Sequence, residues 1–191
     1  MQTESSTISL KNILFNPFRS YKNELSIGLA LAIIASSALI IVLLRSIEAN
    51  FSIEYIFSIF MKTGINAALS VVVFLIAALV YTLITKLLIG KGQVMQLFKL
   101  IAFSLLPAII LMLILLLVKF IGIVNEESAK EYMDFVSLIA GVWSATILAG
   151  GIKNLYAVTT EKAILVAVVC FLLPIVLVLV FGLIFLGYIF F

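Results

Sequence analysis

Long uncharged apolar stretches alternate with short polar segments along the whole chain. A bilayer core needs about 20 apolar residues of helix, and five stretches between successive charges approach or exceed that length. All 21 charged residues lie outside those five stretches. The pattern predicts an all-α fold, a polytopic transmembrane bundle of five helices, because a β-barrel would alternate apolar and polar residues. The expected spans are about 25–44, 63–85, 98–119, 133–151 and 163–190.

Two of the expected spans share a proline motif at corresponding places. Leu105-Leu106-Pro107 recurs as Leu172-Leu173-Pro174, and the shift of 67 positions also superposes Lys86 on Lys153. This correspondence indicates a duplicated, Pro-containing helical hairpin. Proline inside a helix removes a hydrogen bond and bends the helix, so kinks are expected at Pro107 and Pro174.

Two spans carry small residues at intervals of four positions. Small residues let two membrane helices approach closely, so each stripe is interpreted as a helix-packing face. The first stripe consists of Gly28, Ala32 and Ser36, and the second consists of Ser137, Gly141, Ala145 and Ala149.

The segments outside the spans are amphipathic or polar. Residues 1–24 mix apolar and basic positions, which predicts a cytoplasmic amphipathic segment on the membrane surface ahead of a transmembrane domain at 25–191. Between the first two spans, Glu54, Ser58 and Lys62 fall four positions apart. That spacing predicts a short interfacial helix, separate from the span that follows.

The distribution of Lys and Arg predicts the orientation. The N-terminal segment and the second and fourth loops together hold eight Lys and Arg, whereas the other side holds four. Cytoplasmic loops carry the excess of these residues. We therefore expect a multi-pass protein of the cell (cytoplasmic) membrane with its N-terminus in the cytoplasm and its C-terminus outside.

Composition excludes several kinds of chemistry. With 65% hydrophobic residues and a mean hydropathy of +1.36, the chain belongs in a bilayer. It has no histidine, which is the commonest catalytic acid-base and a usual metal ligand. The uncharged stretches hold no carboxylate for a proton relay, and no phosphate-binding loop is present. We expect no catalytic residues, no cofactor and no metal site, and the basic face suits anionic lipids rather than nucleic acid.

Several short motifs accompany the five spans and the paired Leu-Leu-Pro helices. They are Asn16-Pro17-Phe18, the Gly90 turn, Trp143, Gly150-Gly151, Tyr156 and Lys162-Ala163. Together these features resemble the Yip (Ypt-interacting protein) domain family of five-span membrane proteins, in particular its short bacterial members. The resemblance runs from about Asn16 to the C-terminus.

For eukaryotic members, the resemblance implies interaction with Rab GTPases in vesicle traffic. This chain lacks the Asp-Leu-Tyr-Gly-Pro motif of those members, whereas the resemblance to bacterial members implies an extra membrane subunit of an ABC exporter. The resemblance to this family implies no catalytic residues.

Three functional hypotheses follow from the sequence. The leading one is a non-enzymatic scaffold or accessory subunit that binds another membrane protein, such as an ABC exporter subunit, or a second copy of itself. The alternatives are a stand-alone transporter or lipid-moving protein, and a Rab-linked trafficking factor if the chain is eukaryotic. The expected partner contacts lie on the two basic turns, where the same lysines could instead serve only as topology signals. They are Lys86, Lys91, Lys153 and Tyr156.

Overall fold

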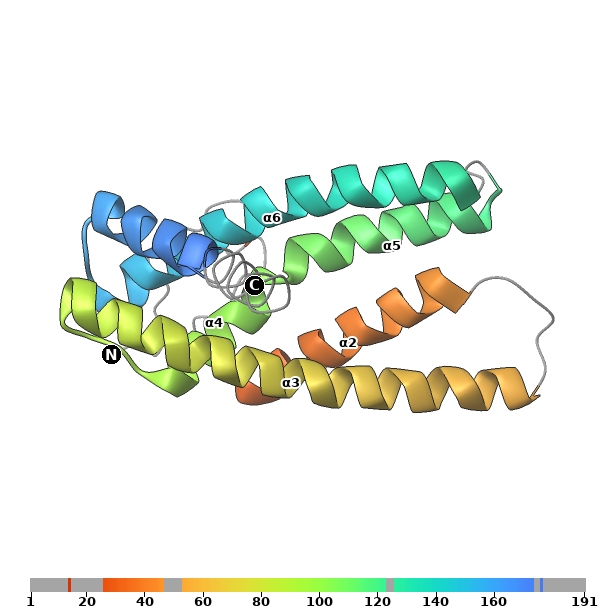
Figure 1. The fold of residues 1–191 in the computed structure, drawn as a ribbon, viewed down its shortest axis with the longest axis horizontal. Coiled ribbons are helices and arrows are strands. Elements are labelled where there is room, and N and C mark those ends of the chain that lie inside the picture. Colours follow the sequence, from red (N-terminus) through yellow and green to blue (C-terminus); the bar gives the residue numbers. More distant parts are fainter. Residues whose placement is uncertain (1–13, 15–25, 47–52, 123–125, 174–175, 177–191) are drawn as a thin grey trace, which may run out of the picture.

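The computed structural model describes residues 14, 26–46, 53–122, 126–173 and 176, and all of its regular structure in those ranges is helical (Figure 1). This confirms the expected all-α class. The named helices are α2 (Ile27–Ser46), α3 (Ile53–Ile89), α4 (Val94–Ser104), α5 (Leu106–Phe120) and α6 (Glu126–Tyr156). Residues 160–173 are also helical. Most of the amphipathic segment 1–24, the end of the fifth expected span and Pro174 lie outside the described residues.

Four described segments are long and apolar enough to cross a membrane. They are Ile27–Leu44, Ile56–Ile89, Val94–Phe120 and Glu131–Tyr156. Each overlaps one of the first four expected spans. The chain is therefore a multi-pass membrane protein, as its composition requires.

The short interfacial helix expected before the second span does not form a separate element. Helix α3 instead runs without interruption from Ile53 to Ile89. No proline lies between residues 53 and 89 to end the helix. Lys62 interrupts the run of apolar side chains but not the backbone hydrogen bonds of the helix. The i, i+4 spacing of Glu54, Ser58 and Lys62 suits a continuous helix as well as a short one.

Helix α4 lies between two pairs of longer helices. Helix α2 packs against α3, and α5 packs against α6, while α4 contacts α2, α3 and α6 (Figure 1). Seven of the eleven residues of α4 are buried, among them Phe98 and Phe103, which are two of the largest fully buried side chains. The outer faces remain apolar: only 17% of the span Ile56–Ile89 is buried within the described chain. Such faces suit contact with lipid.

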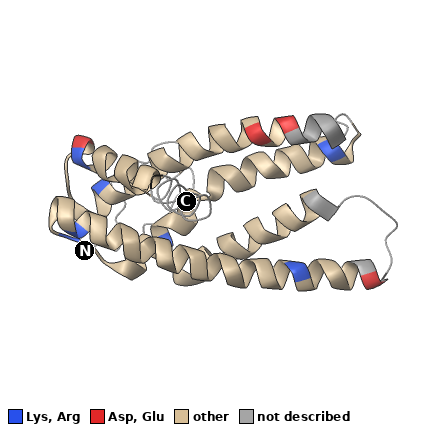
Figure 2. Ribbon diagram, viewed as in Figure 1, with Lys and Arg blue, Asp and Glu red and all other residues tan. Residues whose placement is uncertain are grey.

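The described charges lie toward the two ends of the bundle and leave its middle largely uncharged. One end carries Lys86, Lys91, Lys99, Lys153 and Lys162 with Glu161, and we term it the basic end (Figure 2). The opposite half carries charges of both signs, namely Glu54, Lys62, Lys119, Glu131 and Asp134 (Figure 2). Because charged groups avoid the hydrocarbon core, this segregation places the bilayer between the two ends.

Candidate functional site

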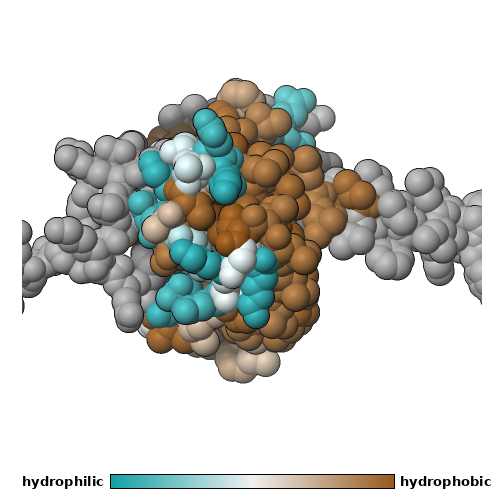
Figure 3. Space-filling view, turned by 90° about the vertical axis from the view of Figure 1, so that its left-hand side faces the viewer, coloured by the Kyte–Doolittle hydropathy of each residue, from teal (hydrophilic) through white to brown (hydrophobic). Residues whose placement is uncertain are grey.

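Four helix termini meet at the basic end. Helices α3 and α6 end there, and α4 and the helix at 160–173 begin there (Figure 1). Viewed along the bundle, hydrophilic residues gather on this end beside a broad apolar flank (Figure 3). The turn after α3 (residues 90–93) and the turn after α6 (residues 157–159) therefore lie in one polar surface. These are the two turns that the sequence predicts to carry partner contacts.

A pair of hydrogen bonds joins the two turns. The Lys91 ammonium donates to the carbonyl oxygen of Tyr156 at 3.2 Å, and the backbone N–H of Gln93 donates to the Tyr156 hydroxyl at 3.2 Å. The Tyr156 carbonyl belongs to the last turn of α6, where carbonyls lack intrahelical donors. Lys91 thus supplies a donor and a positive charge at the negative end of the helix dipole.

The turn after α3 also packs tightly on its own helix. A Cβ atom added at Gly92 would lie 2.8 Å from the carbonyl oxygen of Thr82, which is too close for any side chain. Gly90 adopts φ +71°, the left-handed conformation that glycine takes without strain. A side chain at Gly92 would therefore clash with α3, and one at Gly90 would strain the backbone.

The four expected partner contacts differ in accessibility. Lys86 and Lys91 are exposed, Lys153 is half-buried, and the side chain of Tyr156 is only 5% exposed. Tyr156 packs against the hydrophobic core while its hydroxyl holds the neighbouring turn. The exposed Lys86 and Lys91 are accessible to a partner. Tyr156 holds the turn that carries Lys91.

The shift of 67 positions that relates the proline motifs also relates features of the backbone. Helices α3 and α6 end 67 positions apart, at Ile89 and Tyr156. The next residue in each turn, Gly90 or Ala157, has a positive φ of 71° or 51°. The first hairpin consists of α3 with α4 and α5, and the second of α6 with the helix at 160–173. Helices α3 and α6 end at the same side of the bundle, so the two hairpins run in the same direction. Duplication of the hairpin stays a prediction, and these matching turns support it.

The third span is interrupted where the first proline motif lies. Helix α4 ends at Ser104 and α5 begins at Leu106, with Pro107 in the first turn of α5. Pro107 has no N–H to donate to the carbonyl four residues earlier. The N–H of Leu105 donates to Ala102 at 3.1 Å, and the Ser104 hydroxyl donates to the carbonyl of Ile101 at 2.7 Å. In a regular α-helix the Leu105 N–H would donate to the carbonyl of Ile101. Because it donates to Ala102 instead, the Ser104 hydroxyl supplies a donor to the Ile101 carbonyl.

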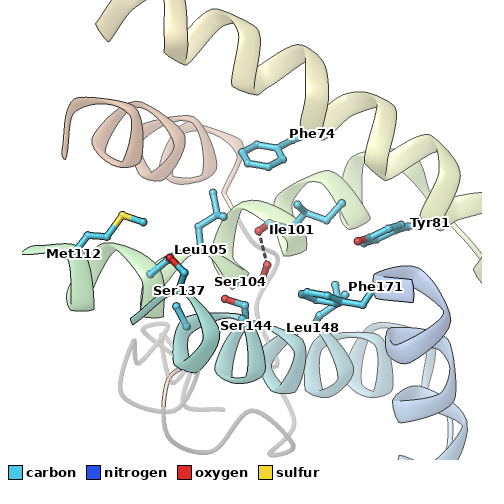
Figure 4. A pocket seen from close by; sticks show the side chains of 13 residues that line it. Phe74, Tyr81, Ile101, Ser104, Leu105, Met112, Ser137, Ser144, Leu148 and Phe171 are labelled. Atoms are coloured by element: carbon cyan, nitrogen blue, oxygen red, sulfur yellow. Dashed lines mark hydrogen bonds between the residues drawn. The ribbon is translucent and has the colours of Figure 1, made fainter. Parts of the chain in front are cut away.

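A cavity of about 310 Å³ lies beside this interruption (Figure 4). Helices α3, α4, α5 and α6 and the helix at 160–173 all contribute to its wall. Its lining residues include three serines and one tyrosine among apolar side chains, and none carries a charge. The polar ones are Tyr81, Ser104, Ser137 and Ser144.

Three pairs of cavity-lining residues are themselves 67 positions apart. The cavity therefore lies between the two hairpins, with corresponding positions of each in its wall. The pairs are Phe74 with Gly141, Tyr81 with Leu148, and Ser104 with Phe171. Sequence reasoning did not identify this site, although the 67-residue shift would have aligned these pairs.

The two small-residue stripes lie in different surroundings. Gly28, Ala32 and Ser36 are all exposed in the described chain, so this stripe faces outward from α2. In the second stripe Ala149 is buried, whereas Ser137 and Gly141 line the cavity. Their use as helix-packing faces stays a prediction.

The described residues offer little for catalysis or metal binding. They contain no group of three or more His, Cys, Asp or Glu placed to hold a metal ion. Cys170 is buried, and the hydroxyls of the cavity have no charged acid or base in the cavity wall. The arrangement can donate and accept hydrogen bonds in an apolar space.

Comparison with protein-family models finds the Yip1 domain over residues 11–183. Neither the curated proteins nor the solved structures give a match to this sequence.

Proposed function

The chain belongs to the Yip1 domain family, and from that premise we propose that it is a non-enzymatic accessory subunit that binds another membrane protein. An ABC exporter subunit is the partner class to test first. The basic end is the observation that carries the proposal, because its turns are held together by hydrogen bonds and it presents exposed lysines beside the apolar flanks of the bundle.

The basic end suits recognition of an acidic surface. Among the residues that the structure describes at this end, five lysines accompany one carboxylate, and the hydrogen bonds of Tyr156 hold the two turns together. Complementary charge at the rim of an interface speeds association and selects partners. Anionic lipid headgroups on the cytoplasmic leaflet would favour the same end.

We also propose that the basic end faces the cytoplasm in the cell membrane. Since Cys170 is buried, a Cys170→Ser background allows single cysteines to report the two ends. A membrane-impermeant maleimide should label Ile121→Cys in intact cells and Lys162→Cys only after lysis. Both positions are exposed and lie at opposite ends. Labelling of Lys162→Cys in intact cells would refute the orientation.

Reversing charge at the basic end should weaken partner binding. The double variant Lys86→Glu with Lys153→Glu is expected to lower co-purification of an ABC exporter subunit in mild detergent by roughly tenfold, because like charges then face each other. Lys62→Glu is the control, since it reverses an exposed lysine near the other end of α3.

Maleimide labelling must accompany this measurement, because lysines also set topology. Equal recovery of the partner with the double variant and with Lys62→Glu would contradict the proposed contact surface. Isolation of the wild type as a lone monomer would contradict the accessory role itself.

The interrupted span favours a second candidate, movement of a lipid or another apolar molecule. Irregular backbone at membrane depth is tolerated where it is covered by protein or lines a cavity. Many carriers bind their substrate between two repeats, at interrupted helices. The minimal requirement of this candidate is that the cavity takes up a lipid-like molecule.

A further inference from the structure

We propose that the cavity between the two hairpins is a binding site for an uncharged amphiphile, a long-chain alcohol or an acylglycerol. The hydroxyl or ester group of the ligand would meet the serine cluster, and its chain would lie against the aromatic and aliphatic wall. The site is independent of partner binding at the basic end.

The polar groups of the cavity are placed to hold a small polar group. Ser104, Ser137 and Ser144 lie near one another at its centre, with Tyr81 farther along (Figure 4). The hydroxyls of Ser137, Ser144 and Tyr81 have no hydrogen-bond partner among the described residues. In hydrocarbon such groups gain most from a ligand that both donates and accepts.

The wall excludes a charged headgroup. No Lys, Arg, Asp or Glu lines the cavity, so a phosphate or carboxylate placed there would lose its hydration without gaining a counter-charge. The remaining lining is apolar and includes Phe74, Leu105, Met112 and Phe171. The chemistry therefore selects neutral lipids over phospholipid headgroups.

Asymmetry between the hairpins creates the space. Phenylalanine stands at 74 in the first hairpin, whereas its counterpart in the second is Gly141, and Phe171 corresponds to Ser104. A Cβ atom added at Gly141 would meet no atom within 4 Å. At each of these two pairs of positions, one hairpin thus has a bulky residue and the other a small one, and all four residues line the same cavity.

The cavity is at a depth that a lipid chain can reach. Ser104 is ten residues from the start of α4, about 15 Å along a helix, which is about half of a ~30 Å hydrocarbon core. Two lining residues, Ser137 and Phe171, are exposed in the described chain. The volume of about 310 Å³ is at the lower end of the ~300 to 1,000 Å³ typical of small-molecule sites.

The test uses a monoacylglycerol with a diazirine in its acyl chain as the probe. The full-length protein is reconstituted in phosphatidylcholine vesicles with the probe, irradiated and digested, and the labelled residues are located by mass spectrometry. Label on cavity residues such as Leu105 and Met112 is expected. Unlabelled monoacylglycerol should compete for those sites, and phosphatidylglycerol should not.

Gly141→Leu should lower cavity labelling by roughly tenfold, because the new side chain occupies the space. Gly64→Leu is the matched control, since Gly64 is exposed and also has no atom near an added Cβ. Unchanged labelling of Gly141→Leu, or label confined to outward residues such as Leu138, would overturn the proposal.

Two further measurements keep the proposal open to refutation. If Gly141→Leu does not fold, Ser144→Ala tests the proposal instead. Loss of one hydrogen bond should lower the preference of the cavity for the monoacylglycerol probe, relative to a hydrocarbon probe of the same chain length, about fivefold. An unchanged preference would overturn the proposal. Cavity labelling that arises only after deletion of residues 174–191 would also overturn it, because the chain's own segment would then be the occupant.

Discussion

Gly151→Leu is expected to destabilise the protein by about 1 to 3 kcal/mol, because it forces extra atoms into a filled contact. A Cβ atom added at Gly151 would lie 2.7 Å from Cδ2 and 2.9 Å from Cγ of Leu100. Leu100 is itself only 3% exposed, so it has little room to move. The measurement is thermal unfolding in detergent, followed by the fluorescence of Trp143, the single tryptophan.

Helix α6 supplies a matched control for this prediction. Gly141→Leu makes the same change ten residues earlier, where an added Cβ meets open space, so its unfolding temperature should stay close to that of the wild type. Leu100→Ala should partly rescue Gly151→Ala, because the two residues are in contact and their effects are then not additive. Equal unfolding temperatures for the two Gly→Leu variants would contradict the close contact of α4 and α6.

The contact at Gly151 gives a physical reason for one motif that suggested the family. The sequence shows Gly150-Gly151 as a pair, and spacing alone directed attention to the stripe that contains Gly141. In the structure, Leu100 approaches α6 at Gly151, which is not a member of that stripe. Spacing therefore located a helix rich in small residues, but not the point of closest approach.

Length and hydrophobicity sufficed to predict the class of fold, because a bilayer sets a minimum length for each span. They could not predict which face of each helix points inward. A soluble helix separates apolar and polar faces, whereas Leu87 on α3 is 85% exposed and as apolar as the buried Leu97 on α4. The cavity and the burial of Tyr156 depend on that choice of face, so neither was predicted.

Tyr156→Ala is expected to cost about 3 to 5 kcal/mol of stability, as truncation of a large buried aromatic side chain does. Tyr156 packs in the core and accepts a hydrogen bond at its hydroxyl from Gln93. Tyr156→Phe keeps the ring and loses only that bond, so a cost of about 0.5 to 1.5 kcal/mol is expected. Chemical unfolding of the three proteins in the same detergent measures both differences.

Tyr132→Ala on the same helix is the control, because Tyr132 is 51% exposed and its truncation should change stability by less than about 0.5 kcal/mol. Similar losses for Tyr132→Ala and Tyr156→Ala would contradict the burial of Tyr156. The comparison also decides how Tyr156 acts in partner binding. If Tyr156→Phe and the wild type bind a partner equally while Tyr156→Ala does not, the residue acts by holding the turn that carries Lys91 rather than by direct contact through its hydroxyl.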